Sequence, residues 1–201
     1  MRRLLLFGLA LAVVAGLAGV VLWVSSGSGG VRAPSWYART VYPLEYESAI
    51  RTSARRNGLD PALVAAVIYA ESRFDAQARS SHGAVGLMQL LPETAAQIAR
   101  DTGGVAFVPA DLDDPRVNIR YGCYYLRTVL GVFGGDRVAA IAAYNAGVGA
   151  VGEWAAAARA AGHPLRLADI PYGETRAFVR SVLETRTIYL QTYGDRLRRA
   201  S

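Results

Sequence analysis

Glu71 is the residue of this sequence best suited to acid–base chemistry. The helical spacing i, i+3, i+4, i+7 places four residues on one face of a helix over 61–72: Val64, Val67, Ile68 and Glu71. The other three are apolar, so this face should pack inward, where a carboxylate rarely lies without a partner or a task. Burial disfavours the charged form and raises the pKa, as a general acid requires near neutral pH.

The alternative for Glu71 is structural. A carboxylate at a helix end can cap the helix or pair with Arg73 or Arg79, which follow it closely in the chain. The helical pattern by itself is compatible with both interpretations, so the rest of the chain has to decide between them.

The composition favours one compact domain that meets an anionic partner. The chain has 201 residues and a net charge of +6, and all 22 of its basic residues are arginines. Such a balance favours nucleic acid, lipid headgroups or acidic cell-wall polymers. The arginines are scattered apart from a terminal cluster of Arg196, Arg198 and Arg199, and no basic block is interleaved with aromatic residues. We therefore expect no nucleic-acid binding.

The cysteine and the histidines indicate neither a metal site nor a cofactor. Cys123 is the only cysteine, so an intrachain disulfide is impossible. It lies in an apolar helical run and is typical of a small core residue rather than a nucleophile. His82 and His163 lie in loops far apart in the sequence, and no metal-ligand spacing occurs. We expect no metal and no cofactor.

Residues 4–24 predict a membrane anchor. These 21 residues carry no charge and would form a helix of about 31 Å, enough to span a bilayer core. Two arginines within residues 1–3 predict a cytoplasmic N-terminus and an extracytoplasmic body. The alternative is a cleaved signal peptide and secretion, although its apolar core would normally be shorter. No cysteine follows the apolar run, so a lipoprotein anchor is excluded. Residues 25–38 read as a tether and 39–201 as the folded domain.

The folded domain should be mainly α, because no segment shows sustained strand alternation and several helix starts are capped. Asp60-Pro61 and Asp114-Pro115 each combine an N-cap with a proline at the first helical position. Loops are expected at 73–85 and 162–171. Helices are expected at 43–56, 61–72, 92–102, 115–133, 137–144, 150–161 and 173–193.

Three blocks of residues resemble the signature of the soluble lytic transglycosylase domain family. The first is Glu71-Ser72-x-Phe74, Ser80, Gly83-Ala84-x-Gly86-Leu87-Met88-Gln89 and Pro92-x-Thr94-Ala95. The second and third are Ala143-Tyr144-Asn145-Ala146-Gly147 and Ile170-Pro171-Tyr172-x-Glu174-Thr175-Arg176-x-Phe178-Val179. Three blocks in the family's order are far more specific than one, and the likeness covers about residues 40–193. It implies a lysozyme-like helical domain of the goose-type and lytic transglycosylase kind.

The resemblance implies that the domain cleaves the glycan strands of peptidoglycan with one carboxylate. Glycosidases usually pair an acid with a second carboxylate, and near Glu71 in the sequence only Asp75 could supply one. In the family the acid protonates the bond between N-acetylmuramic acid and N-acetylglucosamine, and the substrate's acetamido group assists. The same Glu then activates the muramyl O6 hydroxyl, which closes a 1,6-anhydro ring. An intramolecular hydroxyl has a high effective molarity, which helps it outcompete water.

The resemblance also implies a supporting set around Glu71, and each member has a structural alternative. Ser80 would hydrogen-bond near the acid, or be a turn serine. Tyr144 would orient Glu71, and Glu174 would line the cleft, or cap a helix start. Met88 would be core or cleft wall. The remaining members are the loop residues Gly83, Gly86 and Gln89 and the neighbour of Tyr144, Asn145.

Two further features of the sequence concern the expected site. Between Pro171 and Glu174 the chain has Tyr172-Gly173, where the family often has an aromatic and a longer polar residue. A tyrosine stripe at helical spacing, Tyr121, Tyr124 and Tyr125, could line a glycan groove, but such stripes are more often core.

The sequence therefore predicts a membrane-tethered lytic transglycosylase whose partner is the peptidoglycan glycan strand. Two alternatives stay open: a hydrolytic muramidase of the same fold, and a non-catalytic peptidoglycan-binding module. No motif in the sequence identifies a protein partner in cell-wall or secretion machinery.

Overall fold

A computed structural model describes residues 35–103 and 106–199 of the chain. Within these ranges the chain is helical, and strand-type pairing is limited to isolated bridges of Val85 with Arg79 and Leu90. The mainly α prediction is confirmed. The elements are α2 (Ser35–Val41), α3 (Glu47–Arg56), α4 (Pro61–Ser72), α5 (Pro92–Asp101), η1 (Pro109–Asp113), α6 (Pro115–Val132), α7 (Arg137–Ala146), α8 (Val148–Ala160), η2 (Leu167–Asp169) and α9 (Gly173–Arg198).

The expected anchor over 4–24 lies outside the described residues. No helix within the described ranges is long and apolar enough to cross a membrane. Residues from Ala38 onward form one compact unit. The domain boundaries drawn from the sequence stay a prediction.

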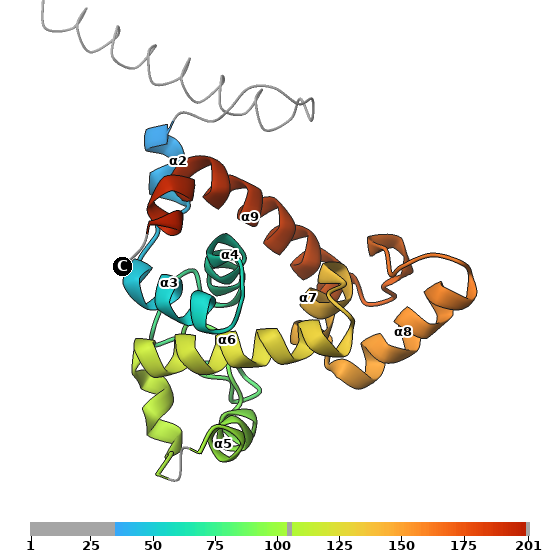
Figure 1. The fold of residues 1–201 in the computed structure, drawn as a ribbon, viewed down its shortest axis with the longest axis horizontal. Coiled ribbons are helices and arrows are strands. Elements are labelled where there is room, and N and C mark those ends of the chain that lie inside the picture. The colour runs from blue at the N-terminus through green and yellow to red at the C-terminus, as the bar shows by residue number, and fades with distance from the viewer. Residues whose placement is uncertain (1–34, 104–105, 200–201) are drawn as a thin grey trace, which may run out of the picture. The chain divides into compact units, whose positions relative to one another are not determined.

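Helix α4 is the centre of the core. Its residues from Ala62 to Tyr69 are all buried, and it packs most extensively against α9 and also against α3. Figure 1 shows α4 nearly end-on, with α9 above it and α3 beside it. The expected cap at Asp60 is confirmed, because its carboxylate accepts the Ala62 N–H at 2.9 Å. The same carboxylate pairs with Arg186 of α9 at 2.6 Å, so the start of α4 is tied to the helix that covers it.

The other helices extend this core and add a smaller one. Helix α6 packs against α3 and α7, and α7 packs against α9. A second cluster lies between α5, η1 and α6 and is built from Leu90, Ala95, Ile98, Ala99, Leu112 and Tyr121. Tyr121 is therefore core, as expected for the tyrosine stripe, and the buried thiol of Cys123, whose pKa burial raises to about 12, is core as well.

The expected helix over 43–56 begins four residues late, at Glu47. Residues 42–46 before it are not helical, and three tyrosine hydroxyls of the core bind carbonyl groups at the start of this segment. Tyr69 donates to Val41 O at 3.1 Å, Tyr193 to Tyr42 O at 3.0 Å, and Tyr189 to Pro43 O at 2.6 Å. Helix propensity is a weak preference, and these tertiary hydrogen bonds override it.

Two further helix ends differ from expectation. Helix α8 begins at Val148, so α7 and α8 are joined by Gly147 alone, at φ +86°. Helix α9 continues to Arg198, five residues beyond the expected end, because Leu197 is buried and Arg196 pairs with Glu47 of α3 at 2.5 Å.

Candidate active site

Glu71 lies in the last turn of the buried helix α4, where the core meets solvent. The three apolar residues of its predicted face are fully buried, as expected. The face itself is not distinct, because the helix is buried on every side up to Tyr69. Arg73 and Phe74 then adopt left-handed backbone at φ +52° and +68°, and the chain turns away with the Phe74 ring anchored in the core. The reversal leaves the carboxyl of Glu71 half-buried at the helix end.

The carboxyl of Glu71 is held without a protein partner. Burial raises its pKa from the ordinary value of 4.5 to about 8, and burial is the sole cause. No charge of a neighbouring carboxylate contributes to this shift. Within residues 35–103 and 106–199, no hydrogen bond or ion pair reaches the Glu71 carboxyl.

The ion pair expected in the structural alternative for Glu71 does not form, because both arginines contact other groups. The guanidinium of Arg73 lies 4.7 Å from the centroid of the Tyr69 ring and donates to the Tyr69 hydroxyl at 2.5 Å. The guanidinium of Arg79 pairs with Asp113, the last residue of η1. Asp75, the nearest carboxylate in the sequence, is exposed and accepts the Gln77 N–H of its own turn at 2.8 Å.

Tyr144 comes from the end of α7 and lies within electrostatic reach of Glu71. Burial raises the pKa of its hydroxyl well above the ordinary value of 10, and the negative charge of Glu71 raises it further. The hydroxyl is therefore a neutral donor, and it donates to Met88 O at 2.9 Å. Its ring packs on Tyr125 of α6, with centroids 5.2 Å apart. Tyr144 thus connects the Glu71 site to the backbone of the loop over 78–90.

The loop over 78–90 is wrapped around one side chain, Asn118 of α6. The buried Asn118 accepts the Met88 N–H at 2.8 Å and donates to Val85 O at 2.8 Å and Leu112 O at 3.1 Å. Gly86 lies against it at φ +77°, and a Cβ there would sit 2.9 Å from Leu112 O and closer still to the Asn118 amide. Gly86 is thus required by protein packing. Gly83, at φ +80°, faces open space.

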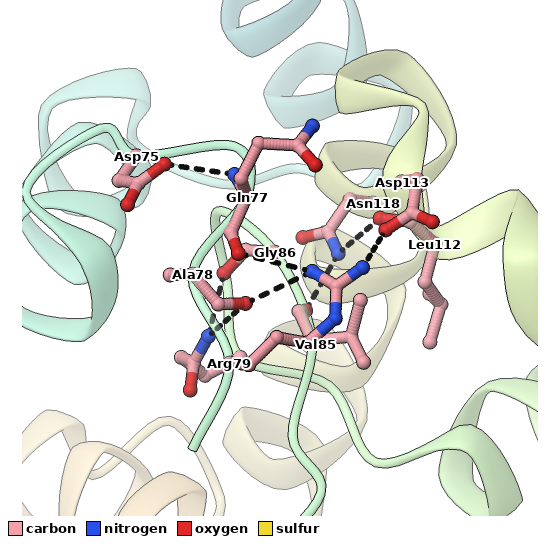
Figure 2. A network of polar contacts seen from close by, with 10 residues as sticks. Asp75, Gln77, Ala78, Arg79, Val85, Gly86, Leu112, Asp113 and Asn118 are labelled. Carbon is pink, nitrogen blue, oxygen red and sulfur yellow. Dashed lines mark hydrogen bonds and ion pairs between the residues drawn. The ribbon is translucent and has the colours of Figure 1, made fainter.

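Polar contacts within the loop complete this arrangement (Figure 2). The Gln89 side-chain amide donates to Gly86 O at 2.9 Å and to Ala78 O at 3.3 Å, with Gln89 itself at φ +45°. Arg79 reaches the carbonyls of Gln77 and Ala78, each at 3.2 Å, and joins the loop to Asp113. The N–H groups of Gln89 therefore stabilise the loop that borders Glu71.

Ser80 is held by hydrogen bonds within its own turn, whereas Met88 is held by packing against helix α6. The Ser80 hydroxyl oxygen accepts the N–H groups of His82 at 3.3 Å and Ala84 at 3.0 Å, so it organises its own turn. The Met88 side chain is fully buried against Gly122, where an added Cβ would lie 2.7 Å from Met88 Cβ. The Met88 side chain is therefore part of the core, one of its two expected roles. The Met88 backbone accepts a hydrogen bond from Tyr144 and donates one to Asn118.

Two motifs 30 residues apart meet at the junction of α7 and α9. The buried Thr175 hydroxyl donates to the Asn145 side-chain oxygen at 2.8 Å. Tyr144 and Glu174 flank these two residues in the sequence, so this hydrogen bond joins the second and third motif blocks. Glu174 is exposed in the first turn of α9.

Three residues that shape the site were not among the site residues predicted from the sequence. Asn118 could have been noticed as a polar residue between the apolar Val117 and Ile119 on a capped helix. Ser72 follows Glu71, and its hydroxyl lies 2.8 Å from Leu87 O and 3.1 Å from Ile68 O, which joins the helix end to the loop. Tyr125 was assigned to the core by default, and nothing in the sequence indicates its contact with Tyr144.

Comparison with known proteins shows consistent similarity over this region. Residues 48–165 match the family model described as the transglycosylase SLT domain. The soluble lytic murein transglycosylase of Escherichia coli (strain K12) is 33% identical over 159 residues, which cover 77% of this chain and 24% of the relative. The chain thus spans about a quarter of the length of the curated relatives it matches.

Two solved structures carry the same fold. An inactive mutant of the lytic transglycosylase Slt from Pseudomonas aeruginosa is 36% identical, with a TM-score of 0.69 over 76% of this chain and 25% of that one. The 70 kDa soluble lytic transglycosylase from Escherichia coli is 31% identical, with a TM-score of 0.72 over 80% of this chain and 26% of that one.

Proposed function

Because this chain belongs to the transglycosylase SLT domain family, we propose that it is a peptidoglycan lytic transglycosylase. It would cleave the β-1,4 bond between N-acetylmuramic acid and N-acetylglucosamine without water and leave 1,6-anhydro-muramyl ends. The relatives that it matches are named for lytic transglycosylase activity, and its own site supplies the acid that this reaction needs.

The protonation state of Glu71 carries the proposal. With a pKa of about 8, the carboxyl is mostly protonated at neutral pH and can act as a general acid. No hydrogen bond or ion pair from the described part of the chain occupies it, so its proton is available to a bound sugar. The high pKa also makes the carboxylate a competent base once it has lost that proton.

The reaction balances with Glu71 as the one titrating group. The bond between muramyl C1 and the leaving O4 breaks as Glu71 protonates O4, and the acetamido oxygen of the same sugar stabilises C1. The muramyl O6 then bonds to C1 and gives its proton to Glu71, which restores the acid. Burial alone shifts the pKa of Glu71, with no contribution from a second carboxylate, and this supports the one-carboxylate route over double displacement.

The surrounding residues receive supporting roles in this proposal. Tyr144 supplies a neutral phenol beside Glu71 and holds the Met88 carbonyl. The Ser80 O–H proton is free to donate, because the hydroxyl oxygen acts as an acceptor in both of its turn hydrogen bonds. The substrate-binding or supporting set is Ser80, Gly83, Gly86, Met88, Gln89, Tyr144, Asn145 and Glu174.

One digestion distinguishes the proposal from its alternatives. Purified peptidoglycan is incubated with the full chain, and the muropeptides are analysed by mass spectrometry. We expect products one water lighter than hydrolytic ones, with no reducing muramyl end. Reducing ends would establish a muramidase instead, and binding to the sacculus without products would leave a binding module.

Two variants sharpen that assay. Glu71→Gln should abolish turnover, about 10³-fold or more, because a neutral amide cannot donate the proton. Asp75→Asn is the matched control: it removes the other nearby carboxylate and keeps an oxygen that can accept the Gln77 N–H. Activity near wild type in Glu71→Gln would place the acid elsewhere.

We further propose that residues 4–24 anchor the protein in the cell membrane by a single span, with the enzymatic domain outside the cytoplasm. The uncharged run of 21 residues and the two arginines before it support this. Cleavage after the run would make the protein secreted instead. N-terminal sequencing of the protein isolated from membranes distinguishes an anchor from a cleaved signal peptide. A mature chain that starts well beyond Val24 would contradict the anchor.

A further inference from the structure

A cavity of about 320 Å³ between α3 and α6 gathers three arginines. Arg56 comes from the last turn of α3, and Arg116 and Arg120 come from α6, with the hydroxyl residues Ser48 and Thr52 on the α3 wall. All three arginines are exposed, and none of them forms an ion pair with a described residue. We call this cavity the arginine groove.

No carboxylate of the described residues neutralises this cluster by an ion pair. None of the residues lining the groove is acidic. Asp114, beside Arg116 in the sequence, caps α6 by accepting the backbone N–H of Arg116 at 2.7 Å. Glu47, one residue before Ser48, pairs with Arg51 and Arg196. Three like charges in one concavity create a positive potential that an anion would relieve.

We propose that the arginine groove binds the phosphate group of a phosphate-bearing ligand. A guanidinium presents paired N–H donors in a plane and binds carboxylate or phosphate oxygens in bidentate fashion. A carboxylate has two oxygens and one charge, so the paired N–H donors of one guanidinium are enough to bind it. A phosphate monoester has three free oxygens and nearly two charges at neutral pH, so it matches several guanidinium groups at once.

A second cavity, which has Arg120 in common with the groove, indicates what accompanies the phosphate. This cavity of about 290 Å³ shares Arg120 and is also lined by Asn57, Tyr121 and Tyr124. The Arg120 guanidinium lies over the Tyr121 ring, 5.1 Å from its centroid, and so stands between the two cavities. Aromatic and amide side chains suit a sugar or a glycerol unit, so the ligand is a phosphorylated saccharide or the headgroup of a phospholipid.

The groove is separate from the Glu71 site. Tyr125, which packs on Tyr144 there, follows Arg120 by five residues, which places it about 140° around the helix from Arg120. The two sites therefore use different sides of α6, and the phosphate proposal does not depend on the glycan-cleaving activity.

Isothermal titration calorimetry on the full chain in a non-ionic detergent tests the proposal. The probes are three species with a terminal phosphate: inorganic phosphate, N-acetylglucosamine 1-phosphate and glycerol 3-phosphate, the deacylated headgroup of phosphatidic acid. We expect binding of phosphate and tighter binding of one of the two esters. The tighter ester identifies the source, saccharide or lipid, and either result supports the groove. No binding of any probe would overturn it.

A charge-matched pair of variants assigns the binding to the groove. The triple change of Arg56→Gln, Arg116→Gln and Arg120→Gln should weaken binding about tenfold or more. The control changes three exposed arginines elsewhere to glutamine, Arg137, Arg180 and Arg199, and should leave affinity within about twofold. Equal weakening in the two variants would show a general charge effect and would refute the site. Circular dichroism verifies that each variant folds.

Discussion

The carboxyl of Glu71 is chemically useful because the fold buries it and gives it no partner. A buried carboxylate normally gains an arginine, and two arginines lie close in the sequence. Both are held by other groups, Arg73 by Tyr69 and Arg79 by Asp113. The uncompensated burial that results raises the pKa of Glu71 to about 8, which suits proton donation near neutral pH.

The buried Glu71 carboxyl should make the free energy of unfolding depend on pH. At pH 7 the unfolded Glu71, with its ordinary pKa of 4.5, is ionised, whereas the folded one is mostly protonated. The unfolded state then binds fewer protons, so stability falls as pH rises from about 4.5 to about 8. Glu71→Gln removes this penalty and should raise the unfolding free energy at pH 7 by roughly 2–3 kcal/mol.

Urea unfolding of wild type and Glu71→Gln at several pH values measures this difference. The gain should be largest above pH 8 and should vanish near pH 4, where both states of Glu71 are protonated. Activity of the wild type should fall above pH 8 as the acid ionises. A stability difference that does not change with pH would mean that burial does not shift the pKa of Glu71.

Among the elements, the loop over 78–90 is defined more by helix α6 than by its own residues. Asn118 satisfies one N–H and two carbonyls of the surrounding backbone from a buried position. Gly86 allows this approach, and Gln89 and Arg79 close the loop from within. The loop glycines that resemble a sugar-contacting motif therefore have different tasks.

Gly86 and Gly83 form a matched pair for testing this. Gly86→Ala must adopt φ +77° and also displace Asn118, so it should cost about 2–4 kcal/mol of stability and loosen the loop. Gly83→Ala has a similar φ of +80° and open space around it, so it should cost about 1 kcal/mol. Chemical denaturation gives both values. Similar losses would mean that backbone conformation, and not the contact with Asn118, makes Gly86 necessary.

At the scale of the compact unit from Ala38 onward, two helices distant in sequence hold its first segment. Tyr69 of α4 and Tyr189 and Tyr193 of α9 donate to three successive carbonyls before α3. Helix α4 and helix α9 also form the most extensive contact of the core. The start of the domain is thus stabilised by its centre and by its last helix.

Tyr189→Phe tests how much one of these hydrogen bonds contributes to the free energy of unfolding. The ring is fully buried, and loss of its hydroxyl leaves the Pro43 carbonyl without its donor, so we expect about 1–2 kcal/mol less stability in denaturant titrations. Tyr172→Phe is the control, because Tyr172 is 57% exposed and its change should stay within about 0.5 kcal/mol. Equal effects would show that the Pro43 hydrogen bond contributes no net stability.

Local signals in the sequence determined the helical class and most helix starts, and they singled out Glu71 as the candidate acid. Asp60-Pro61 and Asp114-Pro115 specify their helix starts because a cap and a proline act within a few residues. The motif blocks identify the family, and the family model confirms it. Glu71 stands out because a carboxylate at apolar helical spacing is conspicuous without any structure.

Tertiary structure alone decided what surrounds Glu71. The non-helical segment before Glu47 and the position of Asn118 depend on hydrogen bonds between segments far apart in the chain. Arg73 forms no ion pair with Glu71 because its guanidinium lies over the Tyr69 ring instead. The sequence could name an acid on a helix, but burial and partners are properties of packed neighbours, and these set its pKa.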